Sequence, residues 1–528
     1  MCLIYVQQSW NRFGYIKLWG ERRLNIFPPI VQPNIKMKGE TNTIKEKNPY
    51  KYNGESTHIS PHSKSLLNTD NQQLTNNKKV YIESYGCQMN FADSEVVASI
   101  IENEGYNSTH DVNDADLILL NTCSIRDKAE QTVRKRLKAF NKLKKENKYL
   151  KVGVLGCMAE RLKTKFLEEE KIVDLVVGPD AYKDLPNLIQ EINEGNSAVN
   201  VILSTDETYG DINPVRLSSN GVSAFVSITR GCDNMCTFCV VPYTRGRERS
   251  RNPESIVNEC KDLFSNGFRE VTLLGQNVDS YLWFGGGPKK NFKNLSKEQK
   301  YNSKNFANLL ETVAKVNEKL RIRFSTSNPQ DMTDDVIDVM SKYKNICNYI
   351  HLPVQSGSSR ILELMNRGYN REEYISLVDK IKNKIPDCAI SMDMITGFCS
   401  ETEEDHKETL SLMDYVKYDF GYMFKYSERP NTPAARMEDN IDEKTKQRRL
   451  AEVIEKQQAH SLLHMQEKLG YTYEVLIEGN SKKSDNHFYG RTTYNSAVVF
   501  EKGTHKIGEY VMVKIEDCTS ATLKGTVL

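Results

Sequence analysis

The run Thr229-Arg-Gly-Cys232-Asp-Asn-Met-Cys236-Thr-Phe238-Cys239 carries three cysteines in the spacing C-x-x-x-C-x-x-C. Three thiolates on one tight loop can bind three irons of a cubane 4Fe–4S cluster and leave the fourth iron without a protein ligand. A structural zinc site fits less well, because it needs a fourth ligand and usually two paired C-x-x-C knuckles. A disulfide framework belongs to short secreted chains, whereas this chain has 528 residues. The loop therefore predicts Cys232, Cys236 and Cys239 as cluster ligands.

This spacing, with the aromatic Phe238 before the last cysteine, resembles the loop of the radical SAM enzymes. The resemblance implies that the three cysteines hold the catalytic cluster and that its open iron binds the amine and carboxylate of S-adenosylmethionine (SAM). It also implies that Phe238 lies beside this cofactor. Reduction of SAM by one electron would yield methionine and a 5′-deoxyadenosyl radical.

Six apolar segments begin with the strand before this loop and alternate mostly with helical segments. Eight β/α units make a closed barrel, so six units predict an open (β/α)6 barrel, which is also the fold that the resemblance implies. The chemistry of such barrels lies at the carboxyl ends of the strands. The predicted strands are 222–229, 270–274, 321–325, 348–352, 389–395 and 419–426.

Polar residues occur at the end of every predicted strand of the barrel, and together they indicate a ligand pocket at one rim. By resemblance, residues after the second strand hold the methionyl amine of SAM, and residues after the third and fourth line its ribose and carboxylate. An aspartate in the fifth strand would bind a hydroxyl group or cap the rim. The predicted SAM-binding residues are Gly275, Gln276, Asn277, Ser325, Gln355 and Asp393.

Upstream of the loop, apolar strands and helical segments alternate from Lys78 onward, which predicts a parallel, doubly wound sheet. Cys87, Cys123 and Cys157 each lie one or two residues beyond a predicted strand. Parallel strands bring such ends to one edge of the sheet, where these folds place ligands. Three buried structural cysteines are the alternative, since free cysteine is often buried, but it does not explain the shared position at strand ends. We expect a second 4Fe–4S cluster with a free iron here.

The motifs Tyr85-Gly-Cys87-Gln-Met-Asn90, Asn121-Thr-Cys123-Ser and Gly156-Cys157-Met-Ala-Glu160 resemble those of the methylthiotransferases, which add SCH₃ to unactivated carbons. Gly-Cys-Gln-Met-Asn and the run 240–250 are most similar to the branch that modifies tRNA. The resemblance implies a methylthio group added to C2 of N6-isopentenyladenosine next to the anticodon, with two SAM molecules and two 4Fe–4S clusters. It implies an electron donor such as flavodoxin or ferredoxin, and it leaves the sulfur donor unknown.

Two other functions stay open. The first is methylthiolation of another target, either a threonylcarbamoyl adenosine or a ribosomal-protein aspartate; the Gln-Met-Asn after Cys87 argues against both by resemblance. The second is a non-catalytic iron–sulfur protein that binds RNA, in which the clusters only order the fold. Open-iron spacing at both cysteine sites argues against this non-catalytic protein. Formation of 5′-deoxyadenosine under reducing conditions would distinguish an enzyme from it.

Several basic residues predict contact with the anticodon stem-loop of tRNA. Arg245, Arg247 and Arg249 alternate after the cluster loop, and an extended segment would point them one way. Guanidinium groups suit phosphate and stack on bases; a salt-bridged surface ribbon is the competing interpretation. The predicted helix 126–148 adds ten Lys/Arg against three acidic residues, where a solvated face is the alternative to backbone contact.

The end of the chain changes character after a long polar helix at 443–469. Short alternating strands with polar turns from 470 to 528 predict a small β-barrel. This segment resembles the TRAM domain, an RNA-binding module. Arg491, Asn495 and Phe500 are candidate contacts, with Phe500 equally suited to the core.

Bulk composition narrows the remaining choices. Net charge is +2, so contact with nucleic acid must come from local patches. No apolar stretch is long enough to span a bilayer, and twelve cysteines without a convincing secretory signal indicate a reducing, cytoplasmic setting. Residues 281–305 are expected to be a mobile insertion. The predicted parts are a disordered extension at 1–77, where Met37 could be the true start, an α/β domain at 78–200, the barrel at 218–442, a connector helix at 443–469 and the RNA-binding domain at 470–528.

Overall fold

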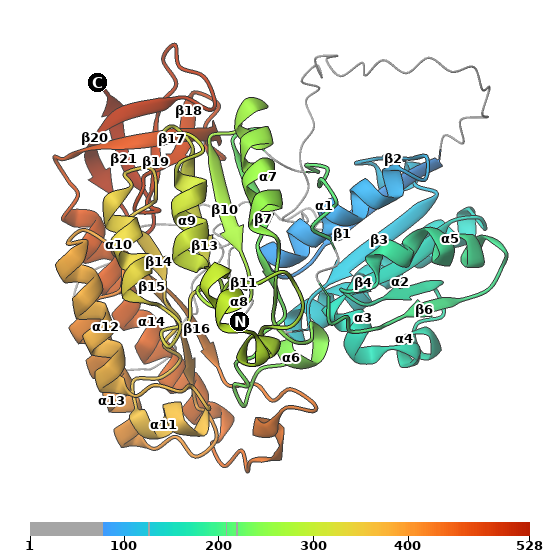
Figure 1. Cartoon of the computed structure of the whole chain (residues 1–528), viewed down its shortest axis with the longest axis horizontal. Helices are drawn as coiled ribbons and strands as arrows, with labels where there is room; N and C mark the ends of the chain where they lie inside the picture. The colour runs from blue at the N-terminus through green and yellow to red at the C-terminus, as the bar shows by residue number, and fades with distance from the viewer. Residues whose placement is uncertain (1–77, 125–126, 207–208, 218–219) are drawn as a thin grey trace, which may run out of the picture. The chain divides into compact units, whose positions relative to one another are not determined.

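The computed structural model describes residues 78–528 except 125–126, 207–208 and 218–219. The expected disorder of residues 1–77 lies outside the described residues. Three folded parts follow one another along the chain: an α/β domain, a partial barrel and a small closed β-barrel (Figure 1).

The first part is a six-stranded, wholly parallel sheet in the order β2-β1-β3-β4-β5-β6, and it confirms the predicted α/β fold. A hydrophobic core lies on each face, one under α1 and α5 and the other under α2, α3 and α4, so the sheet is doubly wound. Strands β2 and β6 are the two edge strands of the sheet and have three residues each. The elements are β1 (Lys78–Ser84), α1 (Gln88–Glu102), β2 (Tyr106–Ser108), β3 (Leu117–Thr122), α2 (Asp127–Glu146), β4 (Lys151–Gly156), α3 (Cys157–Leu162), α4 (Thr164–Glu169), β5 (Leu175–Val177), α5 (Leu185–Asn193) and β6 (Ala198–Asn200).

The second part contains the six strands that the apolar pattern predicts, and it confirms the open barrel. They form two parallel three-stranded sheets, β13-β10-β7 and β14-β15-β16. The sheets meet where Cys347 N donates to Ile322 O at 2.9 Å and Ser327 N donates to His351 O at 3.2 Å. The strands are β7 (Ser223–Ser227), β10 (Glu270–Leu274), β13 (Arg321–Ser325), β14 (Tyr349–His351), β15 (Ala389–Thr396) and β16 (Phe420–Lys425).

Helices cover the outside of this partial barrel, and their apolar faces join the strands in one large core. Short elements follow the first strand, where the chain runs through the cysteine loop. The helices are α7 (Pro253–Ser265), α9 (Phe306–Ala314), α10 (Asp334–Lys342), α11 (Ser359–Leu364), α12 (Arg371–Lys384) and α13 (Glu403–Val416); the short elements are β8 (Thr229–Arg230), α6 (Val241–Thr244) and β9 (Arg249–Ser250).

The segment 281–305 has secondary structure of its own. Strands β11 (Leu282–Trp283) and β12 (Lys304–Asn305) pair antiparallel at its base. Between them lie the 3₁₀ helix η3 (Lys289–Asn294) and α8 (Lys297–Asn302). Ser296 and Gln299 close a capping box at the start of α8, which satisfies two backbone donors of its first turn.

The last part is the long helix α14 (Glu443–Gln466) followed by a closed five-stranded barrel in the order β17-β18-β19-β21-β20. This confirms the predicted connector and small barrel. Strand β18 pairs closely with β17 at Gly490, where a Cβ would lie 2.2 Å from Leu476 O. The strands are β17 (Thr472–Asn480), β18 (His487–Arg491), β19 (Ala497–Glu501), β20 (Tyr510–Cys518) and β21 (Leu523–Val527).

The small barrel docks on the amino ends of β10 and β13 through buried ion pairs. Arg491 bonds Glu478 at 2.6 Å and Glu270 at 3.2 Å, and Arg323 bonds Glu270 at 2.8 Å. Glu270 is fully buried, and its arginine partners lower the pKa of its carboxyl against the effect of burial. Arg491 uses its guanidinium in these ion pairs and keeps 15% of its side chain exposed, and its contact with RNA stays a prediction. Asn495 and Phe500 are buried.

Candidate functional site: two cysteine triads at one domain boundary

The cysteine loop lies at the carboxyl end of β7 and opens into a pocket. Cys232 and Cys236 are buried, and Cys239 is partly exposed. The pocket brings the three thiols together with amide side chains that follow β10 and polar residues that follow β13, as the rim argument predicts. Its lining residues are Cys232, Asn234, Cys236, Cys239, Gln276, Asn277, Ser327, Asn328 and Arg367.

Asn277 has its amide orientation fixed by Asp331. Its Nδ2 donates to Asp331 Oδ2 at 2.6 Å, and Asn234 of the cysteine loop donates to the same oxygen at 3.1 Å. Asn277 Oδ1 is buried, and no described residue donates a hydrogen bond to it. A carbonyl oxygen held beside the cysteines in this way is a ready acceptor for an ammonium group. Asp331 is a residue that sequence reasoning missed.

Arg367 is a second residue that the sequence did not reveal. Its Nη1 lies 3.3 Å from Cys236 Sγ and donates to it. The guanidinium is held in place by Tyr369 Oη at 2.9 Å from Nε and by Pro353 O at 2.9 Å from Nη2. A buried N–H donor on a ligand sulfur stabilises the thiolate and the cluster that it binds.

Burial of the loop favours protonated thiols until a cation displaces the protons. Burial raises the pKa of Cys232 to about 12 and also raises the pKa of Cys239. Loss of these protons is coupled to metal binding. Three thiols from one loop, an open side lined by amides and an N–H donor on one sulfur fit a 4Fe–4S cluster with one iron open.

The second triad lies at the topological switch point of the doubly wound sheet. The chain leaves β1 to one side and returns to β3 on the other, and doubly wound sheets bind ligands at the carboxyl ends of the strands at such a point. Cys87 follows β1, Cys123 follows β3 and Cys157 follows β4, and all three are buried. This confirms the predicted position of the three cysteines at one edge of the sheet.

Glycines allow the three strand ends to approach one another. A Cβ on Gly86 would lie 2.2 Å from Cys123 Cβ, and φ at Gly86 is +120°. A Cβ on Gly156, where φ is +90°, would lie 2.4 Å from Asn121 Oδ1. Side chains at these positions would push the cysteines apart, so the glycines before Cys87 and Cys157 are part of the site.

Arg245 joins this second triad to the barrel. It caps the end of α6 and reaches across the domain boundary, where its Nε donates to Cys157 Sγ at 3.2 Å. Its Nη2 bonds Asp93 Oδ2 at 2.8 Å, and Arg230 bonds Asp93 Oδ1 at 2.6 Å. Burial raises the pKa of Cys157, while the Arg245 cation opposes the rise. Three separate buried thiols with a cationic donor on one of them again fit a 4Fe–4S cluster.

The two triads adjoin the same rim of the barrel. Cys87 packs in one apolar cluster with Leu274, the last residue of β10, directly before the Gly275-Gln276-Asn277 run. Gly275 is required there, because a Cβ would lie 2.1 Å from Thr229 Oγ1.

Two of the three arginines predicted to contact RNA are instead buried at the domain boundary. Arg245 bonds Asp93, and Arg249 bonds Asp180 at 2.7 Å. Both side chains are almost fully buried, so the prediction of RNA contact is wrong for Arg245 and Arg249. Arg247 is 42% exposed and bonds Asp233 at 2.9 Å, and its contact with RNA stays a prediction.

Other predicted SAM contacts lie near the rim but not in the cysteine pocket. Ser325 and Gln355 are buried at the ends of β13 and β14. Asp393 is fully buried on β15, its Oδ1 lies 3.6 Å from His351 Nε2, and neither oxygen has a hydrogen-bond partner among the described residues. Phe238 packs edge-on against Phe398 with ring centroids 6.4 Å apart. Their roles stay predictions.

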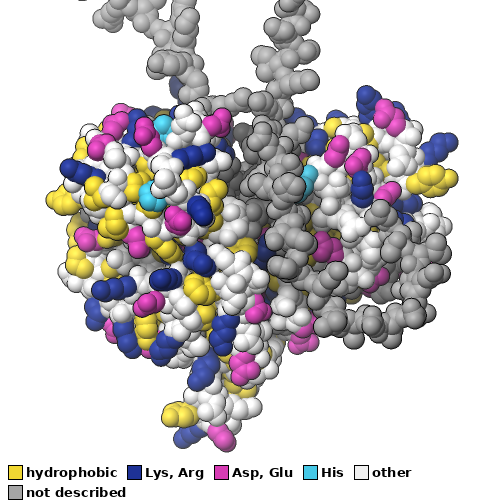
Figure 2. Space-filling model, turned by 90° about the horizontal axis from the view of Figure 1, so that it is seen from above, with side chains coloured by type: hydrophobic (Ala, Val, Ile, Leu, Met, Phe, Trp, Pro, Cys, Tyr) yellow, Lys and Arg dark blue, Asp and Glu magenta, His cyan; other side chains and the backbone are white. Residues whose placement is uncertain are grey.

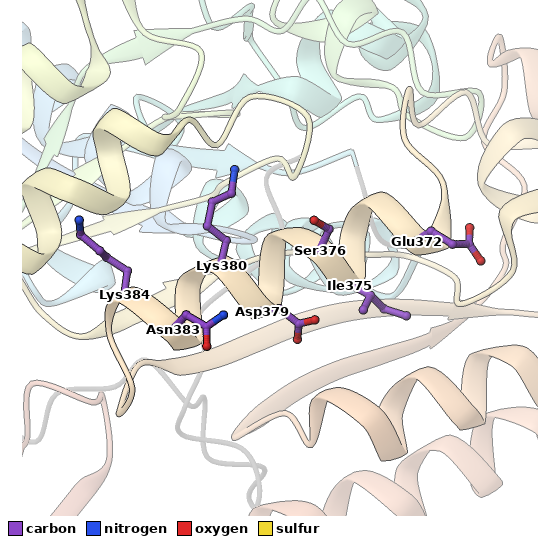
Figure 3. A pocket seen from close by; sticks show the side chains of 7 residues that line it. All are labelled: Glu372, Ile375, Ser376, Asp379, Lys380, Asn383 and Lys384. Atoms are coloured by element: carbon purple, nitrogen blue, oxygen red, sulfur yellow. The ribbon is translucent and has the colours of Figure 1, made fainter.

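A larger hollow lies away from both triads, along the outer face of α12 (Figure 3). All seven lining residues belong to this one helix, and no cysteine is among them. In residues 78–528 with the gaps given above, no group of three His, Cys, Asp or Glu side chains converges as if on a single ion. Among the same residues, no helix is long and apolar enough to cross a membrane.

An open (β/α)6 barrel with this cysteine loop, joined to a doubly wound domain with a second triad, defines the class of radical SAM methylthiotransferases. The chain matches "Uncharacterized protein family UPF0004" over residues 79–178, the "Radical SAM superfamily" over 226–413 and the "TRAM domain" over 466–528. The radical SAM family implies SAM and a 4Fe–4S cluster.

Curated relatives define the particular family. A tRNA-2-methylthio-N(6)-dimethylallyladenosine synthase of Christiangramia forsetii is 67% identical over 85% of this chain and 94% of that protein. A protein of the same name from Flavobacterium johnsoniae is 64% identical over the same shares. A solved radical SAM methyltransferase, TsrM of Kitasatospora setae, is 15% identical with a TM-score of 0.49 over 68% of this chain and 77% of that one. The chain belongs to the tRNA-2-methylthio-N(6)-dimethylallyladenosine synthase family.

Proposed function

We propose that this enzyme adds a methylthio group to C2 of N6-isopentenyladenosine next to the anticodon of tRNA, using two SAM molecules and two 4Fe–4S clusters. The observation that carries the proposal is the pair of buried cysteine triads at one rim of the barrel, with Cys87 packed against Leu274. One triad alone would suffice for cleavage of SAM, so a second one beside it indicates a further step at the same cavity.

The chain supplies orientation and shielding rather than the radical chemistry itself. When bound, the loop cluster supplies the electron that cleaves SAM, and the second cluster supplies a free iron for sulfur. Asn277 Oδ1 accepts the methionyl ammonium, and Asp331 keeps that amide from turning. Arg367 and Arg245 each donate one N–H to a ligand sulfur. Burial of five of the six cysteines limits the access of water to both sites.

The substrate is an unpaired base of the anticodon loop, which can enter a pocket without melting a duplex. The TRAM domain is the RNA-binding module of the chain, and Arg247 adds an RNA contact near the cysteine loop. The electron donor is a flavodoxin or ferredoxin, and the enzyme acts in the cytoplasm, where thiols stay reduced.

The test is anaerobic reconstitution followed by mass spectrometry of tRNA nucleosides. We expect about eight irons per chain and a methylthio group on isopentenyladenosine only. The control substrates, on which no product is expected, are the same tRNA without the isopentenyl group, a threonylcarbamoyl-adenosine tRNA and ribosomal protein. Product on either of the last two would overturn the substrate assignment. Absence of 5′-deoxyadenosine with both clusters loaded would leave a non-catalytic iron–sulfur protein.

A further inference from the structure

The connection between β10 and α9 carries a folded segment, 282–305, which we name the lysine insertion. It leaves the barrel from the carboxyl end of β10, directly after Gln276 and Asn277 of the cysteine pocket. In a (β/α) barrel this is the rim at which substrate enters. The connection therefore lies on the active-site face by topology, although nothing in the reaction described above uses it.

The lysine insertion is fixed to the segment that follows the cysteine loop. Lys289 N donates to Glu248 O at 2.9 Å, and Lys289 Nζ bonds Glu248 Oε1 at 3.2 Å. Leu282 N donates to Ser250 Oγ at 2.9 Å, and Pro288 forms a β-bridge with Arg249. The same chain segment that carries Arg245 to the second triad thus also anchors the insertion on the rim.

The lysine insertion is strongly basic, and most of its lysines have no acidic partner among the described residues. It holds six lysines and one acidic residue, whereas the whole chain has a net charge of only +2. Four of its lysines are exposed, and none of the four has an ion-pair partner among the described residues. Tyr301 is 89% exposed beside them on α8. The four free lysines are Lys290, Lys293, Lys297 and Lys304.

Basic side chains of α2 are only partly paired. Arg134 bonds three glutamates, Arg136 bonds Glu83 and Lys144 bonds Asp174. Lys135, Lys138 and Lys145 are exposed without an ion-pair partner among the described residues, but they lie on the α/β domain rather than on a loop of the barrel rim. The face seen in Figure 2 also mixes Lys and Arg with Asp and Glu. A group of unpaired lysines beside an exposed aromatic ring matches what single-stranded RNA offers, which is phosphates and unstacked bases.

We propose that the lysine insertion is a tRNA-binding surface that holds the phosphates flanking the modified base as this base enters the barrel. The proposal rests on the proposed function, because it assumes an RNA substrate at this rim. Each lysine acts through phosphate charge, without sequence specificity. Tyr301 supplies a face on which a neighbouring base stacks.

The test compares the full-length, cluster-loaded enzyme with the variant K290A/K293A/K297A/K304A. The probe is an isopentenylated tRNA, and its affinity is measured over a series of salt concentrations. We expect weaker binding at low salt and a slope of log K against log[salt] that falls by roughly 0.7 for each single-strand phosphate that the variant no longer neutralises. KM for tRNA rises while kcat stays the same, and SAM cleavage without tRNA is unchanged.

The matched control is K261A/K344A/K407A/K444A, which removes the same charge from exposed lysines elsewhere on the barrel and on α14 that likewise have no ion-pair partner among the described residues. Equal affinity and equal salt slope in the two variants would overturn the proposal. Failure of the proposed function is a separate outcome: wild type would then bind this tRNA with the insertion-dependent slope but leave its nucleosides without a methylthio group. Melting curves of both variants, expected to match wild type, exclude unfolding as the cause.

Discussion

The two cysteine triads reach the same chemistry by opposite routes. The loop triad is local, because three cysteines lie within eight residues and one tight turn brings them together. The strand-end triad is topological: Cys87, Cys123 and Cys157 are separated by whole β/α units and meet only because three parallel strands end at one edge. Yet each triad has one cysteine that accepts an N–H from a buried arginine, Arg367 for Cys236 and Arg245 for Cys157. The difference in construction shows that spacing along the sequence identifies only one of the two cysteine triads.

The largest expected effect comes from removing one thiol from each triad. Either Cys236→Ser or Cys157→Ser should lower iron from about eight to about four atoms per chain and abolish methylthiolated product. Only Cys236→Ser should also abolish 5′-deoxyadenosine, because the proposed function assigns SAM cleavage to the loop triad alone. Iron analysis measures the iron content, and liquid chromatography of the nucleosides measures the methylthiolated product and 5′-deoxyadenosine. Loss of 5′-deoxyadenosine in Cys157→Ser at full loop-cluster content would contradict the division of roles.

The second expected effect distinguishes the ion pair that Arg245 forms with Asp93 from the hydrogen bond that it donates to Cys157 Sγ. Arg245→Gln and Arg230→Gln each remove one of the two arginines from buried Asp93, so each should lower the free energy of unfolding by about 2 kcal/mol. Only Arg245 also donates to Cys157. With the loop cysteines replaced by alanine, the midpoint potential of the remaining cluster should fall in Arg245→Gln, because an N–H donor and a cation are removed beside an anionic site.

Arg230→Gln is the matched control for that measurement. Arg230 bonds the same carboxylate, and none of the cysteines of the two triads is among its described hydrogen-bond partners. Equal shifts of the potential in both variants would mean that Asp93 and its charge balance, rather than the N–H···S bond, set the cluster potential.

The same contrast explains what the sequence could and could not predict. Strands β10 and β13 fall on the predicted bounds, because a buried apolar run is a local signal. The common edge of the strand-end cysteines is also predicted, because every strand of a parallel sheet ends at the same edge whatever the strand order. The alternation of arginines along the sequence predicts that Arg245 and Arg249 point outward from one face of an extended segment. Their acidic partners, Asp93 and Asp180, lie more than sixty residues away in the chain, so only the folded domain boundary reveals the pairs.

The third expected effect is weaker binding of SAM, and it is confined to the loop triad. Asp331→Asn keeps the size of the side chain but lets Asn277 and Asn234 turn, because an amide can meet them with either its oxygen or its nitrogen. The ammonium of SAM then loses a fixed acceptor, which should weaken SAM binding about tenfold, or about 1.4 kcal/mol. Calorimetric titration of the reconstituted enzyme measures it. The potential of the strand-end cluster should not change, and a change there would show that the substitution acts through the fold.

The smallest effect concerns Glu160, three residues after Cys157 in the strand-end triad. Its carboxyl is buried, Oε2 has no hydrogen-bond partner among the described residues, and burial raises its pKa to about 7. The folded state therefore binds this proton more tightly than the unfolded state does. Stability from this group is full below the ordinary pKa of glutamate and is lost as pH rises to about 7.

Glu160→Gln should remove that pH dependence. Between about pH 5 and 7, the free energy of unfolding of the wild-type protein without metal should fall by about 1 kcal/mol per pH unit more than that of the variant. Urea titrations at several pH values measure the difference, with Glu168→Gln on the exposed surface as control. The loop triad has no buried carboxylate placed three residues after a cysteine in this way. Parallel pH curves of the free energy of unfolding for wild type and Glu160→Gln would show that the Glu160 carboxyl is charged in the folded protein. The strand-end triad would then adjoin a negative charge, which Arg245 must also balance.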